Sequence, residues 1–422
     1  MFVSQELNGF GPLTGIKVVE LCEWVAAPSA ARCMAEMGAE VIKVENPVGD
    51  PQRSQGSGYG CNRTEECDPT YDMINAGKDF LSLNLKNPEA MDILMDLLAD
   101  ADVFICSMRD KALVKLGLDF ETLHEKFPRL VWCQMRGYGE FGEYHDKPGF
   151  DAVCWGARGG VMSTFPQKGE SPAVPPQSFG DLNAGAIFVG GILAAVIQQQ
   201  RTGKGDKVTI NLYHVAMWAH ACGLAATQFG VSYPGSRAEA KNPFNNTYRS
   251  KDGVWFLICM PDYNRYFNQM MEMLGQQQLI GNDQLDTLAS LKESGQHATV
   301  VSAVSAGFAT KNYDEWDEIL IQQQVPHQKL YTYDDILADK ELYDNDALRS
   351  YGSTEYGQFS MTTSPIRFGS HGNPPIYLTR PTGYHTAPYL KSKGYSDERI
   401  AELEASGAIR CWHGGEVNEQ HV

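Results

Sequence analysis

The sequence predicts an α/β protein built around a doubly wound, mostly parallel sheet, with a second, smaller α+β domain. Three observations carry this prediction. Short apolar runs alternate with helical segments between residues 15 and 135, and a long apolar helical stretch with a following strand continues that order to residue 212. Beyond about residue 225 the chain becomes richer in Gln, Asn, Met and Tyr and loses this rhythm. Strands that alternate with helices are typical of βαβ units, whose ligands bind at the carboxyl ends of the strands.

Each expected strand is a short apolar run bounded by turn residues. These strands lie at residues 16–21, 40–44, 81–85, 103–106, 130–135 and 207–212. The first helix opens at Pro28 and ends at Gly38, because proline suits the first turn of a helix and glycine suits the residue after the last turn. The other expected helices lie at residues 88–98, 113–117, 120–127, 183–200 and 397–405. Residues 225–330 form the expected second domain.

Composition limits the function. With 422 residues, 43% of them hydrophobic, the chain is long enough for two domains. Its net charge of −17 argues against binding to nucleic acid or to a membrane surface, although a local basic cluster can still hold a small anion. Ten cysteines without a C-x-x-C pair indicate a reduced, cytoplasmic protein without a metal site. The apolar stretch Ala186–Ile197 is too short to span a bilayer, so we expect a buried helix there.

Asp181 is the most informative single residue. It follows Gly180, precedes Gly185 and stands directly before the long apolar helix. We expect backbone N–H groups and the helix dipole to keep such a carboxylate ionised, and its small neighbours leave room for a ligand, as a nucleophile requires. The alternative is that Asp181 only caps the helix, which is the commoner role of an aspartate in this place.

Basic residues and small residues follow several expected strands. The turn at residues 20–28 lacks G-x-G-x-x-G, yet its small residues before a helix suit a pyrophosphate or a thiol arm; the alternative is an ordinary βα turn. The turn at residues 136–140 contains two glycines that allow a close backbone approach. Cations near strand ends suit the phosphates of a nucleotide-like ligand, although each alone is more often a solvated charge. The basic residues are Lys43, Lys78, Arg109, Lys111, Lys115 and Arg136.

An ordered series of motifs runs through the first half of the chain. Its segments are residues 15–21, 26–28, 37–45, 49–50, 75–78, 112–117, 136–140, 180–185 and 202–208. The series resembles the class III coenzyme A transferases (CaiB/BaiF type), the family that includes formyl-CoA transferase and carnitine CoA-transferase. The resemblance covers residues 13–215 strongly and extends more weakly to about residue 405.

The resemblance implies a covalent mechanism. Asp181 matches the family's nucleophilic aspartate, which forms acyl anhydride and aspartyl-CoA thioester intermediates, and Glu140 matches an acidic residue near the reaction centre. No tightly bound cofactor is expected, because coenzyme A and acyl-CoA are substrates. Asn46 stands where relatives often carry an arginine near the adenine or 3′-phosphate, and Arg53 or Arg109 are the candidates to replace it. The expected CoA-binding residues are Val25, Ala26, Lys78, Arg109, Lys115 and Arg136.

The resemblance also implies an architecture. Residues 1–224 form the large CoA-binding, Rossmann-like domain, and the C-terminal segment 331–422 returns to it. Two chains thread through each other as linked rings, so the expected partner is a second copy of this chain.

Within the family, the chain is most similar to transferases that use 2-hydroxy acids such as phenyllactate or 2-hydroxyisocaproate. The similarity lies in residues 111–119, 147–151 and 157–161. Four aromatic residues are candidates to wall an aryl or branched acyl pocket, with core packing as the alternative for each: Trp24, Trp155, Phe165 and Phe179. A racemase of 2-methylacyl-CoA is a competing function, but it needs a histidine where this chain has Phe150. A non-catalytic CoA-binding subunit is the third reading, and the retained Asp181 speaks against it.

Overall fold

The computed structural model describes residues 11–55, 60, 68–353, 357–371, 377–414 and 419–421. The chain divides into two compact units. Unit 1 contains Met1–Val161, Val174–Leu224 and Lys340–Val422, and unit 2 contains Met162–Ala173 and Ala225–Asp339. Unit 2 therefore combines a main segment, residues 225–339, with a segment of twelve residues from the first half of the chain.

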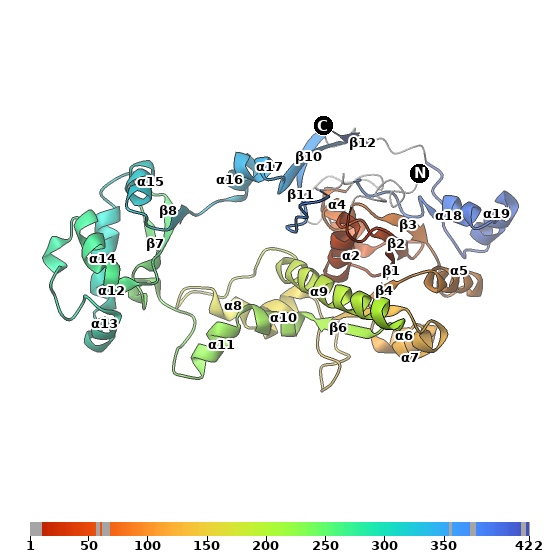
Figure 1. Ribbon diagram of the computed structural model, residues 1–422, viewed down its shortest axis with the longest axis horizontal. Coiled ribbons are helices and arrows are strands. Elements are labelled where there is room, and N and C mark those ends of the chain that lie inside the picture. Colours follow the sequence, from red (N-terminus) through yellow and green to blue (C-terminus); the bar gives the residue numbers. More distant parts are fainter. Residues whose placement is uncertain are drawn as a thin grey trace. The chain divides into compact units, whose positions relative to one another are not determined.

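A six-stranded sheet forms the centre of unit 1 (Figure 1). The strands follow the order β3-β2-β1-β4-β5-β6, and every neighbouring pair is parallel. Sheet order moves outward from β1 in one direction and then in the other, which is the doubly wound arrangement. The predicted parallel sheet is thus confirmed. Its strands are β1 (Lys17–Leu21), β2 (Glu40–Glu45), β3 (Asp79–Ser82), β4 (Val103–Cys106), β5 (Val131–Arg136) and β6 (Lys207–Asn211).

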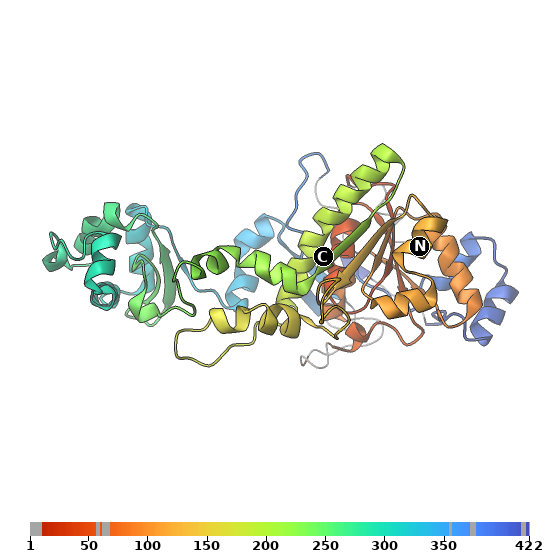
Figure 2. The same cartoon turned by 90° about the horizontal axis from the view of Figure 1, so that it is seen from below.

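Helices cover both faces of this sheet, as Figure 2 shows from a second direction. Successive strand residues point to opposite faces, so Val103 and Ile105 of β4 belong to one core cluster and Phe104 to the other. The first cluster lies under α2 (Ala26–Glu36), α9 (Phe179–Thr202) and α10 (Leu212–Ala219). The second lies under α5 (Pro88–Ala99), α6 (Asp110–Leu116), α7 (Phe120–Lys126), α18 (Thr386–Ser392) and α19 (Asp397–Ala405).

The C-terminal part of unit 1 covers the free edge of the sheet. The N–H of Phe80 in β3 donates to His385 Nδ1 at 3.0 Å, and the N–H of Ser82 donates to Thr386 Oγ1 at 2.9 Å. Side chains from far along the sequence thus satisfy edge groups that a lone strand would leave open. Unit 1 also contains α4 (Pro69–Asn75), α17 (Lys340–Asp344) and an antiparallel sheet of β10 (Leu348–Ser353), β11 (Gly357–Thr362) and β12 (Glu419–His421).

Unit 2 has its own core and is α+β. An antiparallel sheet in the order β7-β8-β9 packs with helices around buried aromatic residues such as Phe256, Phe308 and Trp316. Its strands are β7 (Asn245–Arg249), β8 (Trp255–Cys259) and β9 (His327–Lys329). Its main helices are α12 (Tyr263–Met273), α13 (Leu288–Ser294), α14 (His297–Phe308), α15 (Tyr313–Gln322) and α16 (Tyr333–Ala338). The short helix α8 (Val161–Thr164) begins where the chain first leaves unit 1, and α11 (Ala221–Thr227) lies where it leaves again.

Helix α9 is longer than the sequence predicts. It has 24 residues and begins at Phe179, four residues before the expected start. Gly185 allows it to cross α2 closely, because a Cβ there would lie 2.0 Å from Ser29 Oγ. By length and composition α9 could cross a membrane, but core helices of soluble proteins pass the same test. Here residues such as Phe188 and Ile192 are buried against the sheet.

Candidate functional site

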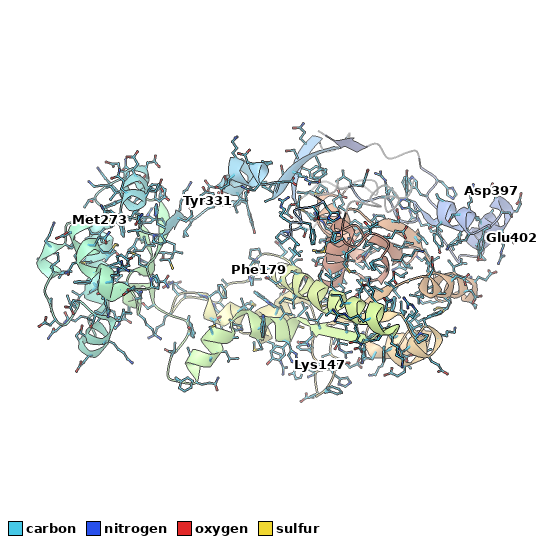
Figure 3. All side chains as sticks on the ribbon, in the orientation of Figure 1. Lys147, Phe179, Met273, Tyr331, Asp397 and Glu402 are labelled. Atoms are coloured by element: carbon cyan, nitrogen blue, oxygen red, sulfur yellow. The ribbon has the colours of Figure 1, made fainter. Side chains whose placement is uncertain are left out.

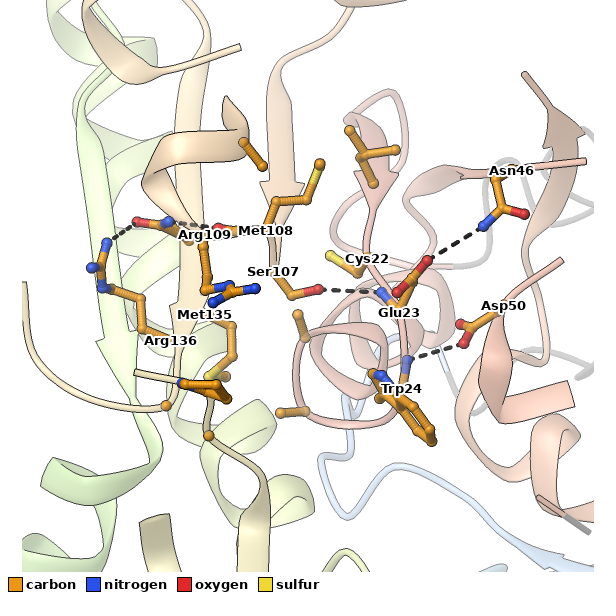
Figure 4. A pocket seen from close by; sticks show the side chains of 18 of the residues that line it. Cys22, Glu23, Trp24, Asn46, Asp50, Ser107, Met108, Arg109, Met135 and Arg136 are labelled. Atoms are coloured by element: carbon orange, nitrogen blue, oxygen red, sulfur yellow. Dashed lines mark hydrogen bonds between the residues drawn. The ribbon is translucent and has the colours of Figure 1, made fainter. Parts of the chain in front are cut away.

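A cavity of about 770 Å³ opens at the carboxyl ends of the parallel strands (Figure 4). Its lining includes Cys22 after β1, Glu45 at the end of β2, Ser107 after β4 and Arg136 at the end of β5. β1 and β4 are neighbours from which the strand order runs in opposite directions. The cavity therefore lies at the switch point of the doubly wound sheet, where ligands of such folds bind.

The loop between β1 and α2 forms one wall of the cavity and has an unusual backbone. Trp24 has a φ of 67°, in the left-handed region, which costs a residue other than glycine about 1–2 kcal/mol. Two hydrogen bonds hold the loop in place (Figure 4). The N–H of Trp24 donates to Asp50 Oδ1 at 3.1 Å, and the N–H of Glu23 donates to Ser107 Oγ at 3.2 Å.

A group of buried ion pairs lies beneath this loop. Lys43 Nζ is 2.8 Å from Glu20 Oε1, and Lys78 Nζ is 2.6 Å from Glu20 Oε2. Lys43 Nζ also lies 3.0 Å from Asp50 Oδ2, so it fixes the carboxylate that holds Trp24. Burial opposes the charge on Lys43, but the carboxylates of Glu20 and Asp50 outweigh it and raise the pKa of Lys43. Removal of either partner would leave an uncompensated buried charge.

Lys78 belongs to this buried group and does not line the cavity. Its ammonium also donates to the Pro28 carbonyl at 2.8 Å and to Asn75 Oδ1 at 2.7 Å. Burial lowers the pKa of Lys78 to about 8, against the raising effect of Glu20. A fully buried lysine with three partners reaches a ligand only by losing them, so we expect a structural role for Lys78 and not the predicted CoA contact.

Asp181 lines the cavity from the first turn of α9. Ser178 occupies the N-cap position, so Asp181 is not the cap of this helix. Burial, and then the charge of Asp151, raise the pKa of Asp181 to about 7. This pKa is higher than we expect for a carboxylate held ionised by a helix terminus, and desolvation is its largest cause.

Gly180 has a geometric reason to be glycine. Its N–H donates to Asp151 Oδ2 at 3.2 Å. A Cβ at this position would lie 2.2 Å from Asp151 Oδ1 and 2.4 Å from Cγ of Trp155. The small neighbour noted in the sequence thus lets Asp151 and the start of α9 approach each other.

Glu140 is not among the residues that line this cavity. Its Oε1 is 2.6 Å from Lys207 Nζ, and its Oε2 accepts from Thr209 Oγ1 at 2.9 Å. Partial burial works to raise its pKa, but these hydrogen bonds hold the pKa of Glu140 below its usual range. The structure therefore ties Glu140 to Lys207 and Thr209 of β6, and the expected place of Glu140 near the reaction centre stays a prediction.

Arg136 lines the cavity but already has a carboxylate partner. Its guanidinium forms a bidentate pair with Asp110, at 2.6 and 3.0 Å, and donates to the His145 carbonyl at 3.1 Å. Arg53 is committed in the same way, with contacts of 2.8 and 3.0 Å to Glu45 and its guanidinium 4.1 Å from the Tyr71 ring centroid. Of the two candidates to replace the arginine missing at Asn46, Arg109 is the exposed one.

Exposed cations line the mouth of the cavity. Arg109 and Lys115 were predicted from the sequence, and both are exposed in the lining. Lys86 and Lys147 also line it and were not predicted. Lys147 pairs with Glu143 at 3.2 Å (Figure 3 shows the loop that carries Lys147). The position of Lys86 shortly after β3 was the signal that could have found it, because it follows the same strand-end pattern as Lys115.

Two small residues at the start of α2 were expected to offer backbone contacts. Ala26 lines the cavity, whereas Val25 is buried beside it as the N-cap residue. First-turn N–H groups of a helix have no partner within the helix, so this end of α2 can hydrogen-bond an anionic ligand.

Aromatic residues sort into three groups. Trp24 lines the cavity together with Phe150, and their ring centroids are 5.3 Å apart at 86°, an edge-to-face contact. Trp155 is buried and packs against Phe179 at 5.4 Å, so these two rings pack at the start of α9. Phe165 belongs to unit 2.

Comparison with known proteins gives the family. The model of CoA-transferase family III matches residues 13–386. The chain is 38% identical over 400 residues to the cinnamoyl-CoA:phenyllactate CoA-transferase of Clostridium sporogenes, covering 94% of this chain and 97% of that protein. It is 33% identical over 400 residues to the (R)-2-hydroxy-4-methylpentanoate CoA-transferase of Clostridioides difficile, covering 94% and 99%. A crystal structure of a CaiB/BaiF family protein from Brucella suis superposes with a TM-score of 0.76 at 24% identity, covering 90% of this chain and 99% of that one. The chain therefore belongs to CoA-transferase family III.

Proposed function

We propose that this CoA-transferase moves coenzyme A from an acyl-CoA to a 2-hydroxy acid that has an aryl or branched side chain, with Asp181 as the covalent nucleophile. One observation carries the proposal. A single cavity is lined by a carboxylate whose pKa is about 7, by exposed cations and by aromatic rings. The two similar transferases described above act on 2-hydroxy acids with aryl and branched side chains, which supports the acceptor class.

The proposed reaction proceeds through enzyme-bound intermediates. The Asp181 carboxylate attacks the donor thioester carbonyl, a C–O bond forms, the C–S bond breaks, and CoA leaves as the thiolate. The thiolate then attacks the aspartyl carbonyl of the anhydride, which gives aspartyl-CoA and the free donor acid. The acceptor carboxylate repeats both steps in reverse. Exchange of one thioester for another is nearly isoenergetic, so no ATP is needed.

The surroundings of Asp181 suit this chemistry. N–H groups in the first turn of α2, which have no partner within the helix, are the donors we propose for the oxyanions of each tetrahedral intermediate. We propose that Arg109 and Lys115, with Lys86, bind the phosphates of CoA, and that Arg136 shapes the site through Asp110. Glu140 is not among the cavity-lining residues, so we give it no step in this reaction.

Racemisation of a 2-methylacyl-CoA is the competing function. It needs a proton-transfer group on each side of the substrate α-carbon. Phe150 occupies the place where the resemblance puts the histidine of a racemase, and a phenyl ring transfers no proton. Loss of α-deuterium from a 2-methylacyl-CoA in the presence of this enzyme would favour racemisation over transfer.

The acceptor panel tests the proposed function. Purified protein is incubated with cinnamoyl-CoA or another acyl-CoA and with single carboxylic acids, and new thioesters are identified by mass spectrometry. Phenyllactate and 2-hydroxyisocaproate should be good acceptors, and formate, oxalate and carnitine poor ones. Faster use of oxalate than of both hydroxy acids would overturn the acceptor class and leave the family unchanged.

The pH profile should report the ionisation of Asp181. Only the ionised carboxylate attacks, and its pKa is about 7. We expect kcat/KM for acyl-CoA to rise about tenfold per pH unit below pH 7 and to level off above it. Asp151→Asn removes the neighbouring charge and should move the inflection to lower pH. A wild-type profile that stays flat down to pH 5 would contradict this assignment.

Lys115 should contribute to the affinity for CoA and not to the rate of the chemical steps. Lys115→Ala is expected to raise the KM for acyl-CoA by roughly tenfold, as the loss of one phosphate contact worth about 1.4 kcal/mol predicts, with kcat little changed. Added salt should weaken CoA binding in the wild type more than in the variant. Lys126→Ala, a change in the last turn of α7, is the matched control. Equal CoA affinity of the Lys115→Ala variant and the wild type at low salt would exclude the contact.

We propose that the enzyme is a cytoplasmic, interlocked homodimer whose C-terminal segment returns to the large domain. Large apolar side chains on α9 are exposed, and a second copy would cover them: Leu182, Ile187 and Ile197. Light scattering should give twice the chain mass of 46.7 kDa. A mass equal to one chain at micromolar concentration would exclude the dimer.

A further inference from the structure

Trp24 and Phe150 form an aromatic pair inside the cavity that contains Asp181. Trp24 lies in the loop after β1. Phe150 comes from a separate segment and directly precedes Asp151. Phe150 is 55% exposed, so much of its ring is open to the cavity and not used in packing. An exposed ring that meets a second ring edge-to-face leaves a surface onto which a further apolar group can pack.

The chain holds this pair in a costly arrangement. Trp24 keeps its left-handed backbone because Asp50, itself 4% exposed, accepts from its N–H and is fixed in turn by Lys43. Such strain persists where surrounding structure over-determines it, and it is concentrated at functional sites. The backbone conformation of Trp24 is thus held by a buried ion pair and not by local preference.

A hydrogen bond also connects the segment of Phe150 to the segment of the proposed nucleophile. Asp151, which directly follows Phe150, accepts from the N–H of Gly180, which directly precedes Asp181. One hydrogen bond therefore links the segment that carries the ring to the turn that carries the carboxylate.

We infer that Trp24 and Phe150 are the specificity-determining surface for the acyl side chain, and that they select acyl groups with an aryl or bulky branched end over short linear ones. The inference rests on the proposed function, because it places the reacting carbonyl at Asp181. An acyl group that ends in a ring offers an aromatic face to the pair, whereas a butyryl chain offers only a methyl group.

The test compares two donors in each variant. We expect Phe150→Ala to lower the ratio of kcat/KM for 3-phenylpropionyl-CoA to that for butyryl-CoA by about tenfold, in line with the contribution of aromatic pairs. Phe150→Tyr should restore most of the ratio. Phe141→Ala is the matched control, because Phe141 is 90% exposed in the same segment and does not line the cavity. Equal losses for both donors, or an unchanged ratio, would overturn the inference.

Variants of Trp24 separate its ring from its backbone. Trp24→Gly removes the ring and also the strain, whereas Trp24→Ala removes only the ring. Both variants should lower the ratio of kcat/KM for 3-phenylpropionyl-CoA to that for butyryl-CoA. Trp24→Gly should unfold at a higher temperature than Trp24→Ala, because glycine adopts the left-handed backbone without strain. If the rings act together, the double variant Trp24→Gly/Phe150→Ala loses less than the product of the single losses. Independent, multiplying losses would contradict a shared surface.

Binding distinguishes failure of this inference from failure of the proposed function. If the wild type transfers no CoA from either donor, the proposed function fails. Calorimetric affinities of 3-phenylpropionate and butyrate for the wild type and for Phe150→Ala then test the pair alone. A selective loss of 3-phenylpropionate affinity supports the inference, and equal affinities overturn it.

Discussion

Asp181→Asn is expected to reduce CoA transfer by at least about 10³-fold, which is a loss of about 4 kcal/mol of transition-state stabilisation. An amide cannot form the anhydride or the aspartyl thioester, so no covalent intermediate remains. The loss of a negative charge in the first turn of a helix costs only about 0.3–1 kcal/mol, too little to produce such an effect. The measurement is the initial rate of thioester exchange, with Asp181→Ala as a second variant.

Stability measurements make this result interpretable. The raised pKa of Asp181 means that the folded state disfavours its ionised form. Ionisation of Asp181 begins to destabilise the folded protein as the pH rises above the pKa of this group in the unfolded chain, and the loss of stability is complete above about pH 7. At pH 8 the Asp181→Asn variant should therefore have an unfolding temperature at least as high as that of the wild type. Asn183→Ala alters an exposed side chain in the same turn and should retain transfer.

Trapping gives an independent check on the nucleophile. In the presence of acyl-CoA, hydroxylamine should convert Asp181 to a hydroxamate that peptide mass spectrometry locates. A folded Asp181→Ala protein that transfers CoA at near the wild-type rate would refute the covalent mechanism.

The sequence predicted the sheet well where local pattern and tertiary structure agree. Strand β4 was predicted at its observed bounds, because four apolar residues in a row are buried on both faces. Strand β3 was placed two residues too late. It begins at Asp79, a polar residue that is fully buried 3.3 Å from His385, more than three hundred residues away. No local pattern contains that partner.

The start of α9 was hidden for a related reason. Ser178 has a φ of 60° and makes no side-chain cap, and Gly180 lowers helix propensity. The start of the helix is instead held by contacts of Gly180 with Asp151 and Trp155, which the local sequence does not reveal.

The site was predicted in part, and burial explains what was missed. Lys78 and Lys115 look alike in the sequence, since each is a lysine near a strand. The structure buries Lys78 beside Glu20 and exposes Lys115 at the cavity. The left-handed backbone of Trp24 also leaves no mark in the sequence, because it depends on Asp50 and its contact with Lys43.

Lys78→Met is expected to destabilise unit 1 by about 3 kcal/mol or more, because it removes one partner from a buried ion pair. Three bonds end at this ammonium, to Glu20, Asn75 and the Pro28 carbonyl, and methionine replaces none of them. The measurement is the first unfolding transition in urea and by calorimetry, together with the KM for acyl-CoA of the protein that remains folded. We expect that KM to stay near the wild-type value, since Lys78 does not line the cavity.

Two further variants separate a structural role of Lys78 from a ligand contact. Lys115→Met makes the same chemical change on an exposed lysine, and it should shift stability by no more than about 0.5 kcal/mol while it raises the KM. Glu20→Gln in the Lys78→Met background removes the unpaired carboxylate and should recover part of the lost stability, because the penalty arises from a buried charge without its partner. An unchanged unfolding transition in Lys78→Met, combined with a tenfold higher KM, would return this lysine to the CoA site and contradict the structural role.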